Sequence, residues 1–344
     1  MKSILAIGAL AFGLAVCVAR AADESVTVEA LKDFPEECRL VRQAALPFDW
    51  MNGKMVVELQ VNDHPLHFIV DTGAVFSAID HDVAKSIGLR QSPLGFSYDL
   101  SDTGGGKISS LSRIDDIKFG ALKTGTLTLL SVALPKGLDG ILAPDLLRNF
   151  DVEIDPAHQV INLFKPHSCA DHVVYWTNNF VKLQLARTDL DQIKIPISMD
   201  GVPIKAVVAT GMAHTLINTR ATKAVLGPNV ALGPAHHMAA ENGGDLSGSE
   251  AKLDSVLIGK WNLVGAVVLA NSHSPGWQFR YSASMADMFI LETLAASGGQ
   301  PFIDAPYESP AATENPQVLM GNDILQNLHM LIDYRTWQIY VSKK

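Results

Sequence analysis

Apolar and polar residues alternate along several short segments of the chain, which is the pattern of half-buried β-strands. These segments are bounded by Gly, Pro, Asn or Asp, and the clearest are Met55–Val61, His67–Val70, Val160–Phe164 and Gln338–Val341. Helical spacing is confined to short pieces, which are His81–Ile87, Asp145–Asn149, Thr219–Val225 and Asp323–Asn327. The pattern predicts a mostly β fold with few short helices.

The same arrangement of segments occurs twice. Stretches of the first half match stretches of the second half in the same order: Met55–Leu89 with Ile193–Gly227 without a gap, Ile114–Gly120 with Leu253–Gly259, and Ile141–Leu147 with Leu319–Leu325. A self-match of this length is typical of a duplicated structural unit. Because 344 residues exceed one ordinary hydrophobic core, we expect two lobes that fold alike.

In the first repeat, an apolar run leads directly into Asp71, Thr72, Gly73 and Ala74. Gly73 permits a tight turn and a close backbone approach, and the Thr72 hydroxyl can form a hydrogen bond to a partner loop. Asp71 stands where a buried strand ends, so we expect its carboxylate to point into a cleft. Taken alone, this short motif is also explained by an Asx turn.

Together with the duplication, the loop resembles the catalytic loop of the retropepsin-like aspartic peptidases, here as two fused copies in the manner of pepsin. The resemblance spans Asn52–Phe164 and Ile193–Val341 and includes a glycine-rich flap and an Ile-Leu-x-x-Asp-Leu-Leu segment. It implies two β-barrel lobes related by a pseudo-twofold axis. It also implies hydrolysis of peptide bonds by a water held between two carboxylates, one from each lobe, with Asp71 as the water-activating residue.

The second repeat departs from this family pattern. Ala209 stands at the position of Asp71, while Thr210 and Gly211 keep the rest of the loop. Two functions therefore stay open. One is an aspartic endopeptidase whose acid comes from another group, such as His214, or from a second chain. The other is a pseudoprotease that binds extended peptide segments of a partner by strand addition.

Glycine clusters mark the expected flap tips, which are Gly104, Gly105 and Gly106 in the first lobe and Gly243 and Gly244 in the second. The tripeptide 102–104 is a second Asp-Thr-Gly, but it lies in this flap and follows no apolar strand, so we interpret it as a coincidence. Near the end of each lobe, Ala143 takes the position of Gly321. We expect Ala143 to be tolerated if its φ angle is negative.

The second lobe carries an insertion at about 271–317, in which residues 283–296 have near-helical apolar spacing. We expect it to pack against its own lobe, with a lid or a subunit contact as the alternative. The predicted order along the chain is a signal peptide at 1–21, an N-terminal leader at 22–50, the first lobe at 51–166, a linker at 167–190 and the degenerate second lobe at 191–344.

The first residues have the pattern of an export signal: Lys2, an apolar run over 4–18 and an Ala-Arg-Ala cleavage site ending at Ala21. A membrane anchor, or lipidation at Cys17, is the alternative. We expect the mature chain in the periplasm or outside the cell. Past the signal, no apolar stretch reaches the roughly 18 residues that a membrane span needs.

The net charge and the cysteines limit the kinds of partner that we expect the chain to bind. The formal net charge is −9, and cleavage of the signal would remove only basic charges, so nucleic acid is not an expected partner. Cys38 and Cys169 would remain and could form a disulfide. His167, Cys169 and His172 lack a clear fourth ligand, so we expect no metal and no cofactor. A peptide or protein substrate is the expected partner, and the oligomeric state stays open.

Overall fold

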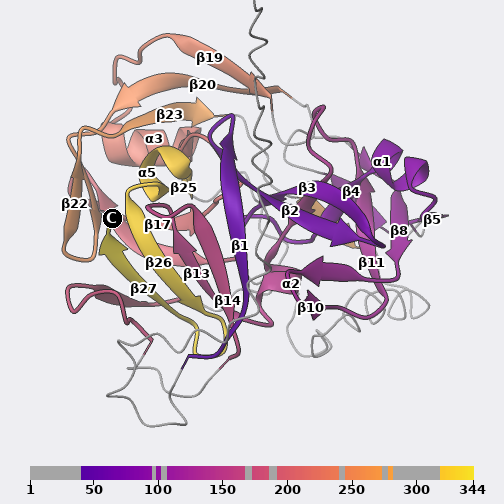
Figure 1. The fold of residues 1–344 in the computed structure, drawn as a ribbon. Coiled ribbons are helices and arrows are strands. Elements are labelled where there is room, and N and C mark those ends of the chain that lie inside the picture. The colour runs from indigo at the N-terminus through magenta and orange to yellow at the C-terminus, as the bar shows by residue number, and fades with distance from the viewer. Residues whose placement is uncertain are drawn as a thin grey trace, which may run out of the picture.

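The computed structural model (Figure 1) describes residues 40–94, 98–101, 107–166, 173–185, 192–239, 245–272, 278–281 and 318–344. Strands make up most of these residues. The helices are α1 (His81–Ser86), α2 (Pro144–Leu147), α3 (Thr219–Leu226) and α5 (Asn322–Leu325). The prediction of a mostly β fold with few short helices is confirmed, and each of these helices overlaps a predicted one.

The first repeat forms a sheet in which segments distant in sequence are neighbours. Its strand order is β2 (Lys54–Val61), β3 (His64–Val70), β12 (Gly140–Leu142), β4 (Ala78–Asp80), β11 (Leu127–Val132), β8 (Ser110–Ile114) and β5 (Arg90–Pro93). Strand β12 runs parallel to β3 and antiparallel to β4, and β4 runs parallel to β11. A hairpin of β9 (Ile117–Phe119) and β10 (Leu122–Lys123) pairs with β2.

The second repeat forms a sheet with the same order and directions. Its strands are β16 (Lys194–Met199), β17 (Val202–Val208), β25 (Val318–Met320), β18 (Leu216–Asn218), β23 (Val267–Ser272), β20 (Asp245–Lys252) and β19 (Ala235–Ala239). Strand β25 runs parallel to β17 and antiparallel to β18, and β18 runs parallel to β23. A hairpin of β21 (Ser255–Ile258) and β22 (Trp261–Val264) pairs with β16. The closed barrels and the pseudo-twofold axis stay predictions that this matching order favours.

Strands from both repeats join between these sheets (Figure 1). Their order is β1 (Arg42–Met51), β14 (Val160–Phe164), β13 (Asp151–Asp155), β26 (Leu328–Asp333), β27 (Gln338–Lys343) and β15 (Val181–Gln184). In the middle, β13 and β26 are antiparallel, with Val152 opposite Ile332. Strand β1 comes from the predicted leader and β15 from the predicted linker, so both segments contribute to the sheet that connects the two halves.

Local sequence explains the hairpins that begin each repeat. Asn62 and Asp63 have φ angles of 46° and 66°, and Asp200 and Gly201 have 46° and 81°. Two successive left-handed residues make the type I′ turn that fits the twist of a two-stranded ribbon, and Asn, Asp and Gly are the residues that tolerate it. Each turn therefore sends the following strand, β3 or β17, back along its neighbour toward the centre of the molecule.

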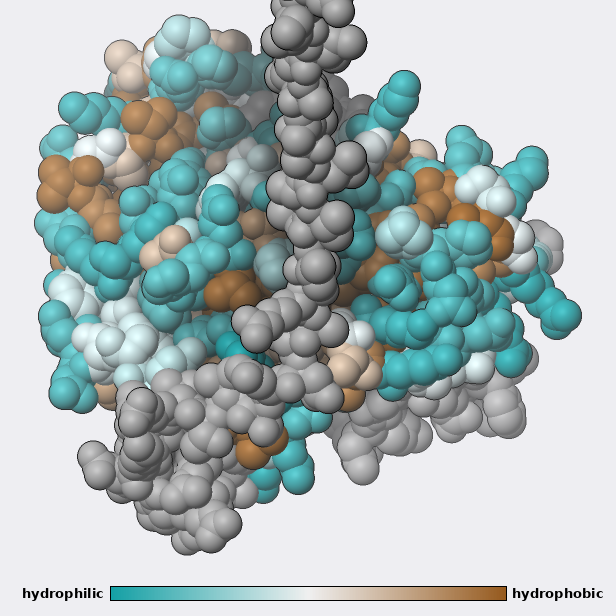
Figure 2. Space-filling view, viewed as in Figure 1, coloured by the Kyte–Doolittle hydropathy of each residue, from teal (hydrophilic) through white to brown (hydrophobic). Residues whose placement is uncertain are grey.

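Both repeats contribute to one hydrophobic core. Val57 and Phe68 of the first repeat and Ile195 and Val208 of the second are buried in the same cluster. On the face shown in Figure 2, hydrophobic residues are scattered among hydrophilic ones. The strand alternation that is visible in the sequence therefore corresponds to side chains that alternate between core and solvent.

A third sheet contradicts, for one strand, the expectation that the insertion packs against its own lobe. Strand β24 (Gln278–Tyr281), from the insertion, pairs antiparallel with β6 (Tyr98–Ser101) of the first repeat, which pairs with β7 (Lys107–Ile108). The expectation that the insertion packs against its own lobe is wrong for this strand, because backbone hydrogen bonding to the flap strand of the other repeat places it there.

Several predicted features lie outside the described residues. These are the signal peptide, Cys38, Cys169, His167, His172, the flap glycines (Gly104, Gly105, Gly106, Gly243 and Gly244) and the apolar segment 283–296. In the described part of the chain, no helix combines the length and apolar character that a membrane crossing requires.

Candidate active site

Asp71 lies at the end of β3, and its backbone N–H donates to the Leu142 carbonyl of β12 at 2.9 Å. The residue is 4% exposed. Its carboxylate oxygen Oδ1 accepts hydrogen bonds from the N–H of Gly73 at 2.8 Å and of Gly211 at 3.2 Å. The carboxylate is therefore oriented by backbone donors from the loops of both repeats, as is suitable for a group that must hold one position.

The two loops are joined by crossing hydrogen bonds between threonines. The Thr72 hydroxyl donates to the Val208 carbonyl at 2.5 Å, and the Thr210 hydroxyl donates to the Val70 carbonyl at 2.7 Å. The Thr210 hydroxyl also accepts the N–H of Thr72 at 3.1 Å, and the Thr72 hydroxyl accepts the N–H of Thr210 at 3.4 Å. Both threonines are fully buried. The structure thus brings Asp71–Gly73 and Ala209–Gly211 together, in the contact that the repeat alignment predicts.

Ala209 occupies the backbone position that matches Asp71. Its N–H donates to the Met320 carbonyl of β25 at 3.0 Å, as that of Asp71 donates to β12. A Cβ atom added at Gly73 would stand 2.7 Å from the Ala209 Cβ, so only glycine fits opposite this methyl group. Ala209 packs in an apolar cluster with Met212 and Leu216. The second loop therefore presents a methyl group where a carboxylate pair would need its second acid.

A half-buried aspartate supports each loop from behind. Asp145 accepts the hydroxyl of Ser77 at 2.6 Å, and Asp323 accepts the hydroxyl of Thr215 at 2.6 Å. Burial raises the pKa of both aspartates, and the hydrogen bonds from Ser77 and Thr215 oppose that rise. Sequence reasoning did not assign these roles, although both Asp and both hydroxyl residues fall on matching positions of the two repeats.

The segments that carry these aspartates differ by one residue. Ala143 has a φ angle of −115°, so the expectation that alanine is tolerated there is confirmed. Gly321 has a φ angle of −93°, but a Cβ atom at this position would stand 2.5 Å from the backbone carbonyl of His214. Glycine is required in the second repeat because the neighbouring backbone is too close.

Two amide side chains tie the halves together at the loops. Asn322 donates to the Gly53 carbonyl at 2.8 Å and to the Thr210 carbonyl at 2.7 Å. Gln192 donates to the Gly73 carbonyl at 2.7 Å. The sequence pattern missed both residues, since an amide side chain carries no signal of its partner. They position the loop backbone on which the geometry of Asp71 depends.

The remaining candidates lie in different surroundings. Ala74 is buried in a cluster with Ile108 and Ala143, so it supports the loop by packing. His214 is exposed, and within the described residues it makes no hydrogen bond to Asp71. The described residues also contain no group of three or more His, Cys, Asp or Glu that could hold a metal ion.

The comparison with known families fits this geometry. Residues 57–146 match the family model described as Aspartyl protease. The match includes the Asp71 loop and ends within α2, so it covers the first repeat and not the Ala209 loop. No curated protein matches the chain significantly.

Proposed function

We propose that this protein is an aspartic-type endopeptidase of exported proteins, in which Asp71 activates the attacking water. The observation that carries the proposal is the pair of crossing threonine hydrogen bonds, Thr72 to Val208 and Thr210 to Val70. These bonds hold Asp71 where two matching loops meet. The family match over residues 57–146 supports the same chemistry, and the signal pattern at 1–21 supports an exported substrate.

In this proposal, the Asp71 carboxylate takes a proton from a bound water while that water attacks the peptide carbonyl carbon. A two-carboxylate site would also supply a proton that polarises the carbonyl oxygen. Ala209 cannot supply one. Because a positioned acid or base contributes about 10²- to 10⁴-fold to a rate, we expect slow cleavage by the native chain.

The Ala209 methyl in its apolar cluster favours a second candidate, a pseudoprotease that binds extended peptides without cleaving them. Peptide binding by strand addition uses backbone hydrogen bonds and needs no catalytic acid. In this case the loops would serve only to hold the two halves in a binding geometry.

Incubation of the purified mature chain with a diverse peptide mixture at acid and neutral pH, followed by mass spectrometry, separates the candidates. Peptidase function predicts slow cleavage that pepstatin reduces and Asp71→Asn abolishes. Asp82→Asn, an exposed change in α1, is the matched control and should change nothing. Saturable peptide binding without cleavage would establish the pseudoprotease. Efficient cleavage that survives Asp71→Asn would overturn the assignment of Asp71.

A further inference from the structure

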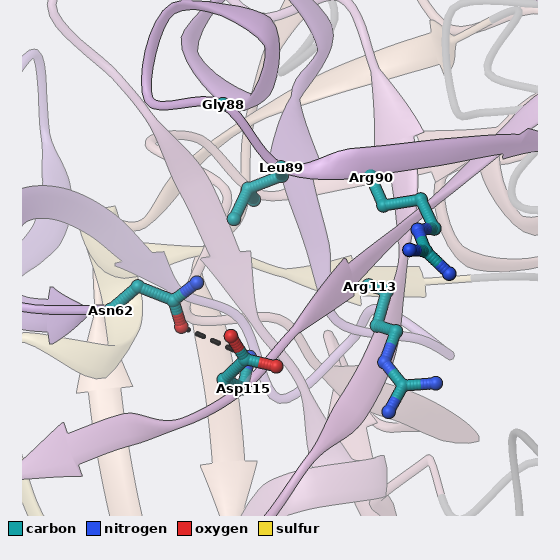
Figure 3. Close-up of a pocket in the computed structure, with 6 residues that line it drawn as sticks. All are labelled: Asn62, Gly88, Leu89, Arg90, Arg113 and Asp115. Atoms are coloured by element: carbon teal, nitrogen blue, oxygen red, sulfur yellow. Dashed lines mark hydrogen bonds between the residues drawn. The ribbon is translucent and has the colours of Figure 1, made fainter.

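A pocket of about 440 Å³ opens on the first repeat, lined by Asn62, Gly88, Leu89, Arg90, Arg113 and Asp115 (Figure 3). This volume lies within the range of small-molecule sites. None of its lining residues belongs to the Asp71 loop, so any ligand here would be additional to a peptide in the cleft. Four of the six lining residues carry polar or charged side chains, which indicates a polar ligand.

Two arginines stand together on one side of this pocket. Arg90 of β5 is the cross-strand partner of Arg113 of β8, and both are exposed. Like charges directly opposite each other on paired strands are destabilising unless something neutralises them. In the part of the chain that the structure describes, no acidic side chain forms an ion pair with either arginine. The neighbouring acids Asp63 and Asp116 are instead paired with Lys118 and Lys123.

The opposite side of the pocket offers a fixed amide and a carboxylate. The Asn62 Oδ1 accepts the backbone N–H groups of Asp115 at 3.0 Å and Asp116 at 3.1 Å. This contact fixes the amide, so its Nδ2 donor faces the interior of the pocket (Figure 3). Asp115 lines the same pocket and is exposed. Opposite charges thus face one cavity without forming an ion pair with each other.

The second repeat shows which of these features the fold itself needs. At the position of Asn62 stands Asp200, whose Oδ1 accepts the N–H of Ser255 at 2.8 Å. The turn contact is therefore kept in both copies. In contrast, Lys252 stands at the position of Arg113, and β19, the strand that corresponds to β5, contains no arginine. The arginine pair is not required to build this unit, which makes a binding role the better explanation for it.

We propose that the pocket binds a small zwitterion of the α-amino acid class, with its carboxylate between Arg90 and Arg113 and its ammonium group at Asp115. Guanidinium groups bind carboxylates through paired charge-assisted hydrogen bonds. A zwitterion can pair its carboxylate with the arginines and its ammonium group with Asp115 at the same time, whereas a simple anion or a simple cation can pair with groups of one sign only.

Isothermal titration calorimetry on the full mature chain tests this proposal, with glycine and L-alanine as probes and acetate, ethylammonium and inorganic phosphate as comparisons. We expect saturable binding of the zwitterions and weaker binding of the other probes. Arg90→Gln, Arg113→Gln and Asp115→Asn should each weaken L-alanine binding by about tenfold or more, since each removes a charge-assisted hydrogen bond. Lys252→Gln, the matching position of the second repeat, should leave it unchanged.

The outcome separates this site from the proposed peptidase. Asp71→Asn should leave L-alanine binding unchanged even if it abolishes cleavage. Circular dichroism melts show whether each variant is folded. The proposal fails if the folded native chain gives no saturable heat with either amino acid at millimolar concentration, or if folded Arg113→Gln binds L-alanine as the native chain does. It also fails if phosphate binds more tightly than L-alanine and Asp115→Asn does not matter.

Discussion

At the end of β3 the chain carries Asp71, and at the matching backbone position at the end of β17 it carries Ala209. Around this difference the two loops make matching contacts. Thr72 and Thr210 exchange hydrogen bonds, and a half-buried aspartate supports each loop. The threonine contacts and the carboxylate therefore have different roles. The crossing contacts hold the halves together, while the proposed activation of water needs a carboxylate that only the first copy carries.

Restoring the missing carboxylate should have the largest effect. In Ala209→Asp we expect peptide hydrolysis at acid pH to rise by about 10²- to 10⁴-fold, because a second acid can then polarise the substrate carbonyl. Cleavage of a fluorogenic peptide measures this, with and without pepstatin. Adding Asp71→Asn to the variant should abolish the gain. If Ala209→Asp folds normally yet remains inert, the cleft differs from a peptidase by more than one side chain.

Exchanging the residue types at Gly321 and Ala143 should show that the repeats are packed differently. Gly321→Ala forces a methyl group against the His214 backbone, so we expect a loss of about 3 kcal/mol in the free energy of unfolding. Ala143→Gly meets no such contact and should cost about 1–2 kcal/mol, through added flexibility of the unfolded chain and the loss of one buried methyl group. Urea denaturation of both variants is the measurement. Equal effects would contradict the difference in packing.

The crossing threonines should contribute equally if the loop contact is reciprocal. Thr72→Val and Thr210→Val each leave a buried carbonyl, of Val208 or Val70, without its donor. We expect each to lower the free energy of unfolding by about 1–3 kcal/mol. Thr219→Val, at the exposed start of α3, is the control and should change it little. A large effect at one threonine and none at the other would show that the contact is not shared.

The smallest effect that we expect is on the pH dependence of stability at Asp145, which supports the first loop. Burial raises the pKa of Asp145 above the ordinary value of an aspartate, with the Ser77 hydrogen bonds opposing the rise. Between the Asp145 pKa of the unfolded chain and the higher pKa of the folded chain, the folded chain keeps a proton that the unfolded chain releases. The contribution of Asp145 to the free energy of unfolding therefore falls as the pH rises through this range. Asn stays neutral throughout. The stability of the native chain relative to Asp145→Asn should therefore be greater at pH 4 than at pH 7.

Guanidinium denaturation at both pH values gives this difference, and Asp82→Asn serves as the exposed control. A native advantage that grows toward neutral pH would have the wrong sign and would show that the Ser77 hydrogen bonds dominate over burial at this carboxyl.

The residue pattern alone predicted the clearest strands, the short helices, the repeat and the position of Asp71 with its mismatch at Ala209. These features are local, because alternation, turn residues and loop motifs depend on neighbours along the chain. The aspartates that support the two loops are also visible in the repeat, since Asp145 and Asp323 stand at matching positions.

The tertiary structure showed further contacts that the residue pattern did not predict. It placed the Asn322 amide on two carbonyls of different halves, set β24 beside the flap strand β6, and left room for a side chain at Ala143 but not at Gly321. It also aligned Arg90 with Arg113 across two strands. Contacts of this kind join residues that are far apart in sequence. Their strength depends on distances of a few ångströms that no residue pattern along the chain encodes.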